Sequence, residues 1–146
     1  MHSLTIKNKL VIFTFFAVLL LLILSVKAQI PDEIILSLKS GNAKVLSGYF
    51  NQNVELVIPD SDNVFSKAQA QLIVNDFFSN NPPNNFTVIH QGGKEGAHYV
   101  IGNLLTPEGP FRVYFLLKKS EGKDYIHQLR IEKQEKPDEE RVTKPE

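Results

Sequence analysis

Four segments in the second half of the chain most constrain its fold, because each is rich in β-branched and aromatic residues. The segments are FTVIHQ (86–91), AHYVIGNLLT (97–106), FRVYFLLKK (111–119) and DYIHQLRIE (124–132). The breaks between them read GGKEG, PEGP and SEGK. Short breaks that contain glycine or proline join neighbouring antiparallel strands. This part of the chain therefore predicts an antiparallel sheet.

The part before these strands predicts helices. Pro31 suits the first turn of a helix, whose apolar face comprises Ile34, Ile35 and Leu38. AKVLSGYF (43–50) also carries apolar residues at helical spacing, whereas VELVIP (54–59) alternates like a strand. We therefore expect two short helices and one strand before residue 60.

The third helix has the clearest pattern. Ser66 and Gln69 match a capping box, in which two side chains satisfy free backbone N–H groups at a helix start. The apolar positions then follow the spacing of one helix face: Ala70, Ile73, Val74, Phe77 and Phe78. Pro82 and Pro83 cannot continue a helix, so the helix should end before them.

Together these segments predict an α+β fold, a curved antiparallel sheet with about three N-terminal helices packed on one face. Strand alternation separates the side chains of residues 111–117 onto two faces. The apolar set should face the helices: Phe111, Val113, Phe115 and Leu117. Arg112, Tyr114 and Leu116 should lie on the other face. Arg112 and Arg130 could form an anion-binding patch on the outer face, but surface ion pairs with Glu132 and Glu121 are the default expectation.

The N-terminus predicts a signal peptide of residues 1–28. Lys7 and Lys9 precede an uncharged run of 15 residues, 10–24, which is shorter than the roughly 20 residues of a membrane-spanning helix. Val26 and Ala28 are small enough for a signal peptidase site. We therefore expect export, to the periplasm or outside the cell, and no membrane contact after cleavage. An uncleaved N-terminal anchor is the alternative.

The remaining chain divides into a domain of residues 29–132 and a charged tail of residues 133–146, which we expect to be disordered. Cleavage removes three of the 16 lysines and arginines and none of the 16 acidic residues, so the net charge becomes −3. This charge argues against nucleic-acid binding. The chain has no cysteine, so no disulfide holds the fold.

The stretch IHQGGKEGAHYVIG (89–102) raises the question of a metal or phosphate site. A turn centred on Lys94 would place His90 opposite His98, on one side of the sheet. A register shifted by one residue would pair His90 with Tyr99 and send His98 to the opposite face. Metal binding needs a third ligand, and a phosphate loop leads into a helix, whereas a strand follows here. We therefore interpret the stretch as a plain hairpin, without metal or cofactor.

The order of elements resembles the nuclear-transport-factor-2-like fold, which ketosteroid isomerase and scytalone dehydratase share. More narrowly, HQGG, YVIGNLLTPEGPFRVYFLLKK and IHQLRIE resemble a family of small exported bacterial proteins classed as a domain of unknown function. The resemblance covers Ile30 to about Glu132. It implies a cone-shaped cavity between the curved sheet and the helices. The family pattern carries a histidine like His90 and no fixed counterpart of His98.

The resemblance implies no established activity, and no residue matches the acidic base and donors of the isomerases. We expect a non-enzymatic domain that binds a small apolar ligand in its cavity, with His90, Phe77, Val113 and Phe115 as the ligand-binding residues. Docking of a protein partner through the sheet is the second possibility. Homodimerisation would use the exposed sheet face around Tyr114 and Arg112. The alternative function is a small-molecule isomerase or hydrolase that uses the cavity.

Overall fold

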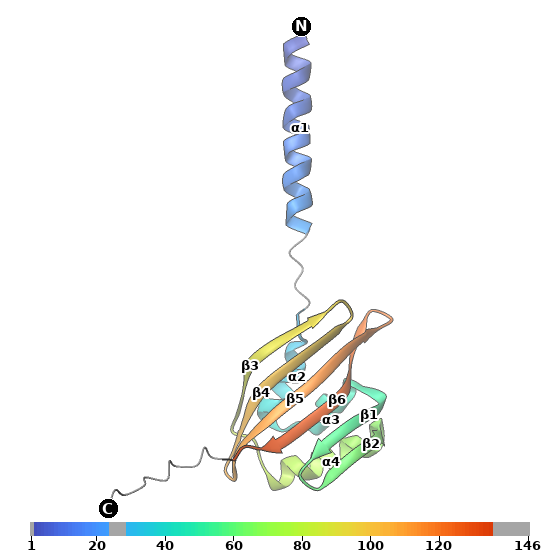
Figure 1. Cartoon of the computed structure of the whole chain (residues 1–146), viewed down its shortest axis with the longest axis vertical. Coiled ribbons are helices and arrows are strands. Elements are labelled where there is room, and N and C mark those ends of the chain that lie inside the picture. The colour runs from blue at the N-terminus through green and yellow to red at the C-terminus, as the bar shows by residue number, and fades with distance from the viewer. Residues whose placement is uncertain (1, 24–28, 136–146) are drawn as a thin grey trace, which may run out of the picture. The chain divides into compact units, whose positions relative to one another are not determined.

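The computed structural model of the chain describes residues 2–23 and 29–135 (Figure 1). The chain separates into two units, residues 1–30 and residues 31–146. The described part of the first unit is a helix, α1 (His2–Ile23). No helix in the described part of the chain combines the length and the apolar character needed to cross a bilayer. The predicted cleavage site and most of the predicted tail, residues 24–28 and 136–146, lie outside the described residues.

The second unit is an α+β fold built on a six-stranded sheet, which confirms the predicted fold class. The strands are β1 (Phe50–Ile58), β2 (Ser61–Ser66), β3 (Asn85–Lys94), β4 (Ala97–Thr106), β5 (Gly109–Ser120) and β6 (Lys123–Lys133). Their order is β2-β1-β6-β5-β4-β3, so β2 and β3 are the edges. The four C-terminal strands form consecutive antiparallel hairpins, as the turn clusters predict.

Two features of the sheet correct the prediction. β1 pairs with β6 in parallel, so the sheet is mixed and not purely antiparallel. β2 was not expected, yet it pairs antiparallel with β1 along its whole length. Its sequence, SDNVFS, lacks regular apolar alternation, and Val64 is 60% exposed. β2 therefore forms through backbone pairing with β1, which a pattern of side-chain burial does not reveal.

Three helices lie on one face of the sheet (Figure 1): α2 (Asp32–Ser40), α3 (Ala43–Gly48) and α4 (Lys67–Asn80). α4 begins with the predicted capping box. The Ser66 side chain accepts a hydrogen bond from the Gln69 backbone N–H, and the Gln69 side chain accepts one from the Ser66 backbone N–H. α4 ends at Asn80, before the two prolines.

The core lies between these helices and the inner face of the sheet, which we define as the face that the helices cover. Four alternate residues of β5 point inward and are at most 3% exposed: Phe111, Val113, Phe115 and Leu117. Arg112 and Lys118 point to the opposite, outer face and are exposed. The predicted alternation of β5 is confirmed.

Tyr49, which follows α3, ties the helices to each other and to the sheet. Its hydroxyl donates a hydrogen bond of 2.5 Å to Glu33 Oε2 on α2. This hydrogen bond, together with partial burial and the charge of Glu33, raises the pKa of Tyr49. The backbone carbonyl of Tyr49 accepts a hydrogen bond of 2.6 Å from the Ile126 N–H on β6. One residue thus connects three elements.

His127 makes the stability of the fold depend on pH. It lies at a bulge in β6, where pairing with β5 shifts between Leu116 and Leu117. Partial burial and the nearby Lys118 lower the pKa of His127 below its usual 6.5. The unfolded chain therefore takes up this proton at a higher pH than the folded chain. The stabilisation is complete above pH 6.5 and is lost as the pH falls through the lower, folded-state pKa.

We expect His127→Gln to reduce the loss of unfolding free energy between about pH 7 and pH 5. Urea unfolding at several pH values measures this slope. His98→Gln serves as the control, because it replaces another strand histidine in the same way, on β4. Equal slopes for the parent chain and His127→Gln would contradict the prediction.

Candidate functional site

A pocket at one end of the sheet brings together four separated segments of the chain. Its volume is about 320 Å³, near the lower end of the range of about 300–1,000 Å³ for small-molecule sites. Its lining residues come from the β1–β2 turn, the C-terminal half of α4, the start of β5 and the end of β6. We call it the α4 pocket.

The floor of the α4 pocket is apolar and partly aromatic. It comprises Ile58, Ile73, Phe77 and Phe111. The Phe77 and Phe111 rings meet edge to face, with centroids 5.2 Å apart and planes at 88°. Both phenylalanines are at most 6% exposed, so their positions are set by packing. Such a floor offers an apolar ligand a surface that excludes water.

The rim of the α4 pocket is polar and comprises Asp60, Ser61, Asp76, Asn80, Asn81 and Lys133. On α4, Asp76 shares a helix face with Ile73 and Asn80, because residues three to four apart point the same way. Asp60 approaches from the β1–β2 turn. A pocket with an apolar floor and a few polar groups at its edge is the usual form of a small-molecule site.

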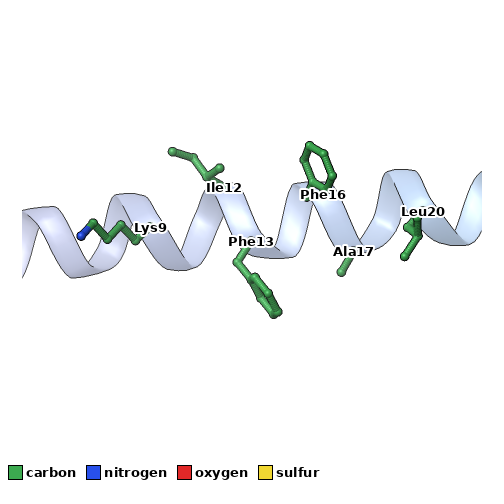
Figure 2. A pocket seen from close by; sticks show the side chains of 6 residues that line it. All are labelled: Lys9, Ile12, Phe13, Phe16, Ala17 and Leu20. Atoms are coloured by element: carbon green, nitrogen blue, oxygen red, sulfur yellow. The ribbon is translucent and has the colours of Figure 1, made fainter.

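A larger hollow, of about 410 Å³, runs along α1. Its six bordering side chains all belong to that helix: Lys9, Ile12, Phe13, Phe16, Ala17 and Leu20 (Figure 2). Their spacing of three and four residues follows one side of the helix. Because the bordering side chains come from a single helix, they provide no opposing wall, and we assign no binding site there.

The structure does not bring the four predicted ligand-binding residues together. Phe77 lines the α4 pocket. Val113 and Phe115 are 0% exposed and belong to the packed core. His90 is exposed on the edge strand β3. The α4 pocket lies at the strand end, beside Phe111. The ligand-binding role of these residues stays a prediction.

The hairpin between β3 and β4 corrects both predicted registers. Gly93 faces His98, and His90 faces Ile101. The chain reverses at Glu95 and Gly96, so the two preceding glycines continue the strand and do not form the turn. His90 and His98 consequently point to opposite faces of the sheet. In the described residues, no group of three or more His, Cys, Asp or Glu side chains is arranged to hold a metal ion.

His90 belongs instead to an aromatic cluster on the outer face of the sheet. His90 Nε2 and Tyr99 Oη form a hydrogen bond of 3.0 Å. The Tyr99 ring stacks on Tyr114, with centroids 6.2 Å apart and planes at 23°. Gly92 faces Tyr99, and a Cβ atom at this position would lie 2.8 Å from Tyr99 Oη. The glycine therefore leaves room for the tyrosine ring against the edge strand.

The two arginines of the outer face, Arg112 and Arg130, both contact polar side chains of the same chain. Arg130 forms ion pairs with Glu132 at 3.3 Å and with Glu55 at 3.9 Å. Arg112 does not form its predicted ion pair. With the Gln134 carboxamide oxygen turned toward it, that oxygen accepts hydrogen bonds from Arg112 Nε at 2.8 Å and Nη2 at 3.0 Å. The expected pairing with Glu132 is confirmed for Arg130 alone, and the pairing with Glu121 is not observed in the described residues.

Most residues of the α4 pocket escaped the sequence analysis. Asp76 is exposed, and the pattern of apolar residues gave it no role. Its spacing from Ile73 and Phe77 would have placed it on the pocket side of α4. Asp60 and Lys133 carry no comparable signal, because the pairing of β1 with β2 and β6 determines where they lie.

Comparison with known proteins relates the second unit to one family and one fold. Residues 31–132 match the family described as domain of unknown function DUF4783. A crystal structure of a DUF4783 family protein from Bacteroides ovatus is 35% identical, with a TM-score of 0.71 over 75% of this chain and 100% of that chain. No curated protein matches the chain.

Two more distant structures bear on the fold alone. A designed nuclear-transport-factor-2 protein is 13% identical, with a TM-score of 0.58 over 68% of this chain and 90% of that one. A putative calcium/calmodulin-dependent protein kinase II association domain from Xanthomonas campestris is 17% identical, with a TM-score of 0.52 over 68% and 79%. These likenesses confirm the nuclear-transport-factor-2-like fold.

Proposed function

We propose, from the premise that the chain belongs to the DUF4783 family, that its domain is an exported, non-enzymatic binding module. Its ligand is a small molecule with a largely apolar body, held in the α4 pocket. The observation that supports this proposal is the pocket itself, with an edge-to-face pair of phenylalanines at its floor and polar groups at its rim. Export rests on the lysines and the apolar run at the N-terminus.

The exposure of the pocket carboxylates favours binding over catalysis. Isomerases with buried acids tune them through an apolar, water-poor environment. Asp60 and Asp76 lie at the rim and are exposed, so they lack that environment. Docking of a protein partner or a second copy through the outer face remains the second candidate, supported by the stacked Tyr99 and Tyr114 rings.

Filling the α4 pocket with a larger side chain tests the proposal. Ile73 is half-buried and lines the pocket, whereas its neighbour Leu72 is 70% exposed and is not among the lining residues. We expect Ile73→Trp to weaken binding of the neutral fluorescent probe N-phenyl-1-naphthylamine about tenfold or more, a loss of about 1.4 kcal/mol. Leu72→Trp, which adds the same side chain one position away, should change the affinity less than about twofold.

Probe fluorescence should be excited at a wavelength that tryptophan does not absorb. The apolar side chains that α1 exposes could also bind the probe. We therefore attribute to the α4 pocket only the part of the binding that Ile73→Trp removes and Leu72→Trp retains. Equal affinity of the two variants would refute the α4 pocket as the binding site. Thermal unfolding of both variants checks that each is folded.

A further inference from the structure

The charges at the rim of the α4 pocket are unbalanced. Asp60, Asp76 and Lys133 line the pocket, which gives its rim a formal charge of −1 at neutral pH. Asp60 comes from the β1–β2 turn and Asp76 from α4, so two different walls each contribute a carboxylate. An apolar pocket bordered in this way presents a negative potential to whatever enters it.

Neither pocket carboxylate is neutralised within the described residues. The ion pairs among these residues involve Arg130 with Glu55 and with Glu132. No described side chain forms a hydrogen bond or an ion pair with Asp60 or Asp76, and Lys133 does not come within 4.0 Å of either carboxylate. Their charge is thus available to a ligand.

Other acidic residues of the fold show the contrast. Glu33 accepts the hydrogen bond from Tyr49, and both Glu55 and Glu132 contact Arg130. These three carboxylates stabilise contacts within the chain. Asp60 and Asp76 make no such contribution, although both border a concave, apolar site.

Building on the proposed function, we infer that the α4 pocket selects a cationic ligand, an apolar body that carries an ammonium or similar group. The body occupies the floor of Phe77, Phe111, Ile58 and Ile73. The positive group lies at the rim, near Asp60 and Asp76. Opposite charge at the rim adds selectivity to the affinity that apolar contact provides.

Three probes with the same naphthyl body separate charge from apolar contact: 2-naphthylmethylamine, 2-naphthylmethanol and 2-naphthaleneacetate (the carboxylate). At neutral pH these are cationic, neutral and anionic. In titration calorimetry with the full chain at low salt, we expect the amine to bind best and the carboxylate worst, with about a tenfold difference between them. The difference should shrink at 1 M salt, because salt screens charges near the surface.

Neutralising the carboxylates tests which residues are responsible. Asp60→Asn and Asp76→Asn should each weaken amine binding about three- to fivefold and leave binding of the alcohol within about twofold. Asp62→Asn is the matched control. Asp62 is an exposed acid on β2, two residues from Asp60, and is not among the lining residues, so its replacement should change amine binding less than about 1.5-fold.

The outcomes distinguish the two proposals. The predicted order of the three probes, together with the predicted effect of the two variants, supports the inference. Equal binding of the three probes, or a preference for the carboxylate, overturns the cationic preference and leaves the α4 pocket as an apolar site. An amine preference that Asp62→Asn reduces as much as Asp60→Asn and Asp76→Asn also overturns it. If none of the probes binds, both the inference and the proposed function fail.

Discussion

Phe115→Ala should lower the free energy of unfolding by about 3–5 kcal/mol, one of the two largest effects we expect. Phe115 lies on β5 at the centre of the inner sheet face and is 0% exposed. Removing its ring forfeits the burial of an aromatic side chain and leaves a cavity in a packed interior. Urea unfolding followed by circular dichroism measures the change.

Leu116→Ala provides the matched control for Phe115→Ala. Leu116 is the next residue on β5, points to the outer face and is only half-buried, so its truncation should cost about 1 kcal/mol. The comparison also tests the shape of the interior. A cost below about 1.5 kcal/mol for Phe115→Ala would mean that this ring borders a hollow. The cone would then be open at its centre, and the packing described here would be wrong.

Much of the fold could be predicted because its elements carry local signals. The alternation in residues 111–117 identified the inner side chains of β5, and Ser66 with Gln69 identified the start of α4. β2 and the parallel pairing of β1 with β6 carry no such signal. Both depend on backbone hydrogen bonds between segments whose proximity is created by the rest of the fold.

The candidate site was less predictable for the same reason. Phe77 was identified because its helix face is regular, and it does line the α4 pocket. Val113 and Phe115 were expected at a cavity wall, but both are buried in the packed core. Strand periodicity identifies the side chains of the inner face, but it does not show which of them the helices cover. Both predicted hairpin registers were wrong because Gly92 and Gly93 continue β3 and do not form the turn. Glycine allows a reversal without requiring one.

Gly102→Ala should lower the free energy of unfolding by about 2 kcal/mol, although alanine is intrinsically better than glycine in a strand by about 0.5–1 kcal/mol. A Cβ atom at Gly102 would overlap the ring of Phe86 and would lie 2.7 Å from the Thr87 carbonyl oxygen. Phe86 is 1% exposed and cannot swing into solvent without losing its burial. Overpacking therefore outweighs the gain in chain entropy. Urea unfolding measures the net effect.

A double-mutant cycle shows whether the Phe86 ring causes this cost. Phe86→Leu alone should cost about 1–2 kcal/mol, because it removes part of a buried side chain. Gly102→Ala with Phe86→Leu should cost at least about 0.5 kcal/mol less than the sum of the single changes, since leucine vacates part of the space that the new methyl group needs. The contact with the Thr87 backbone oxygen remains, so the compensation is incomplete. Additive costs in the cycle would show that the ring does not occupy the space above Gly102.

Gly48→Ala is the control for Gly102→Ala. Nothing lies within 4 Å of a Cβ atom at that position of α3. The change should therefore leave stability unchanged or raise it by up to about 1 kcal/mol.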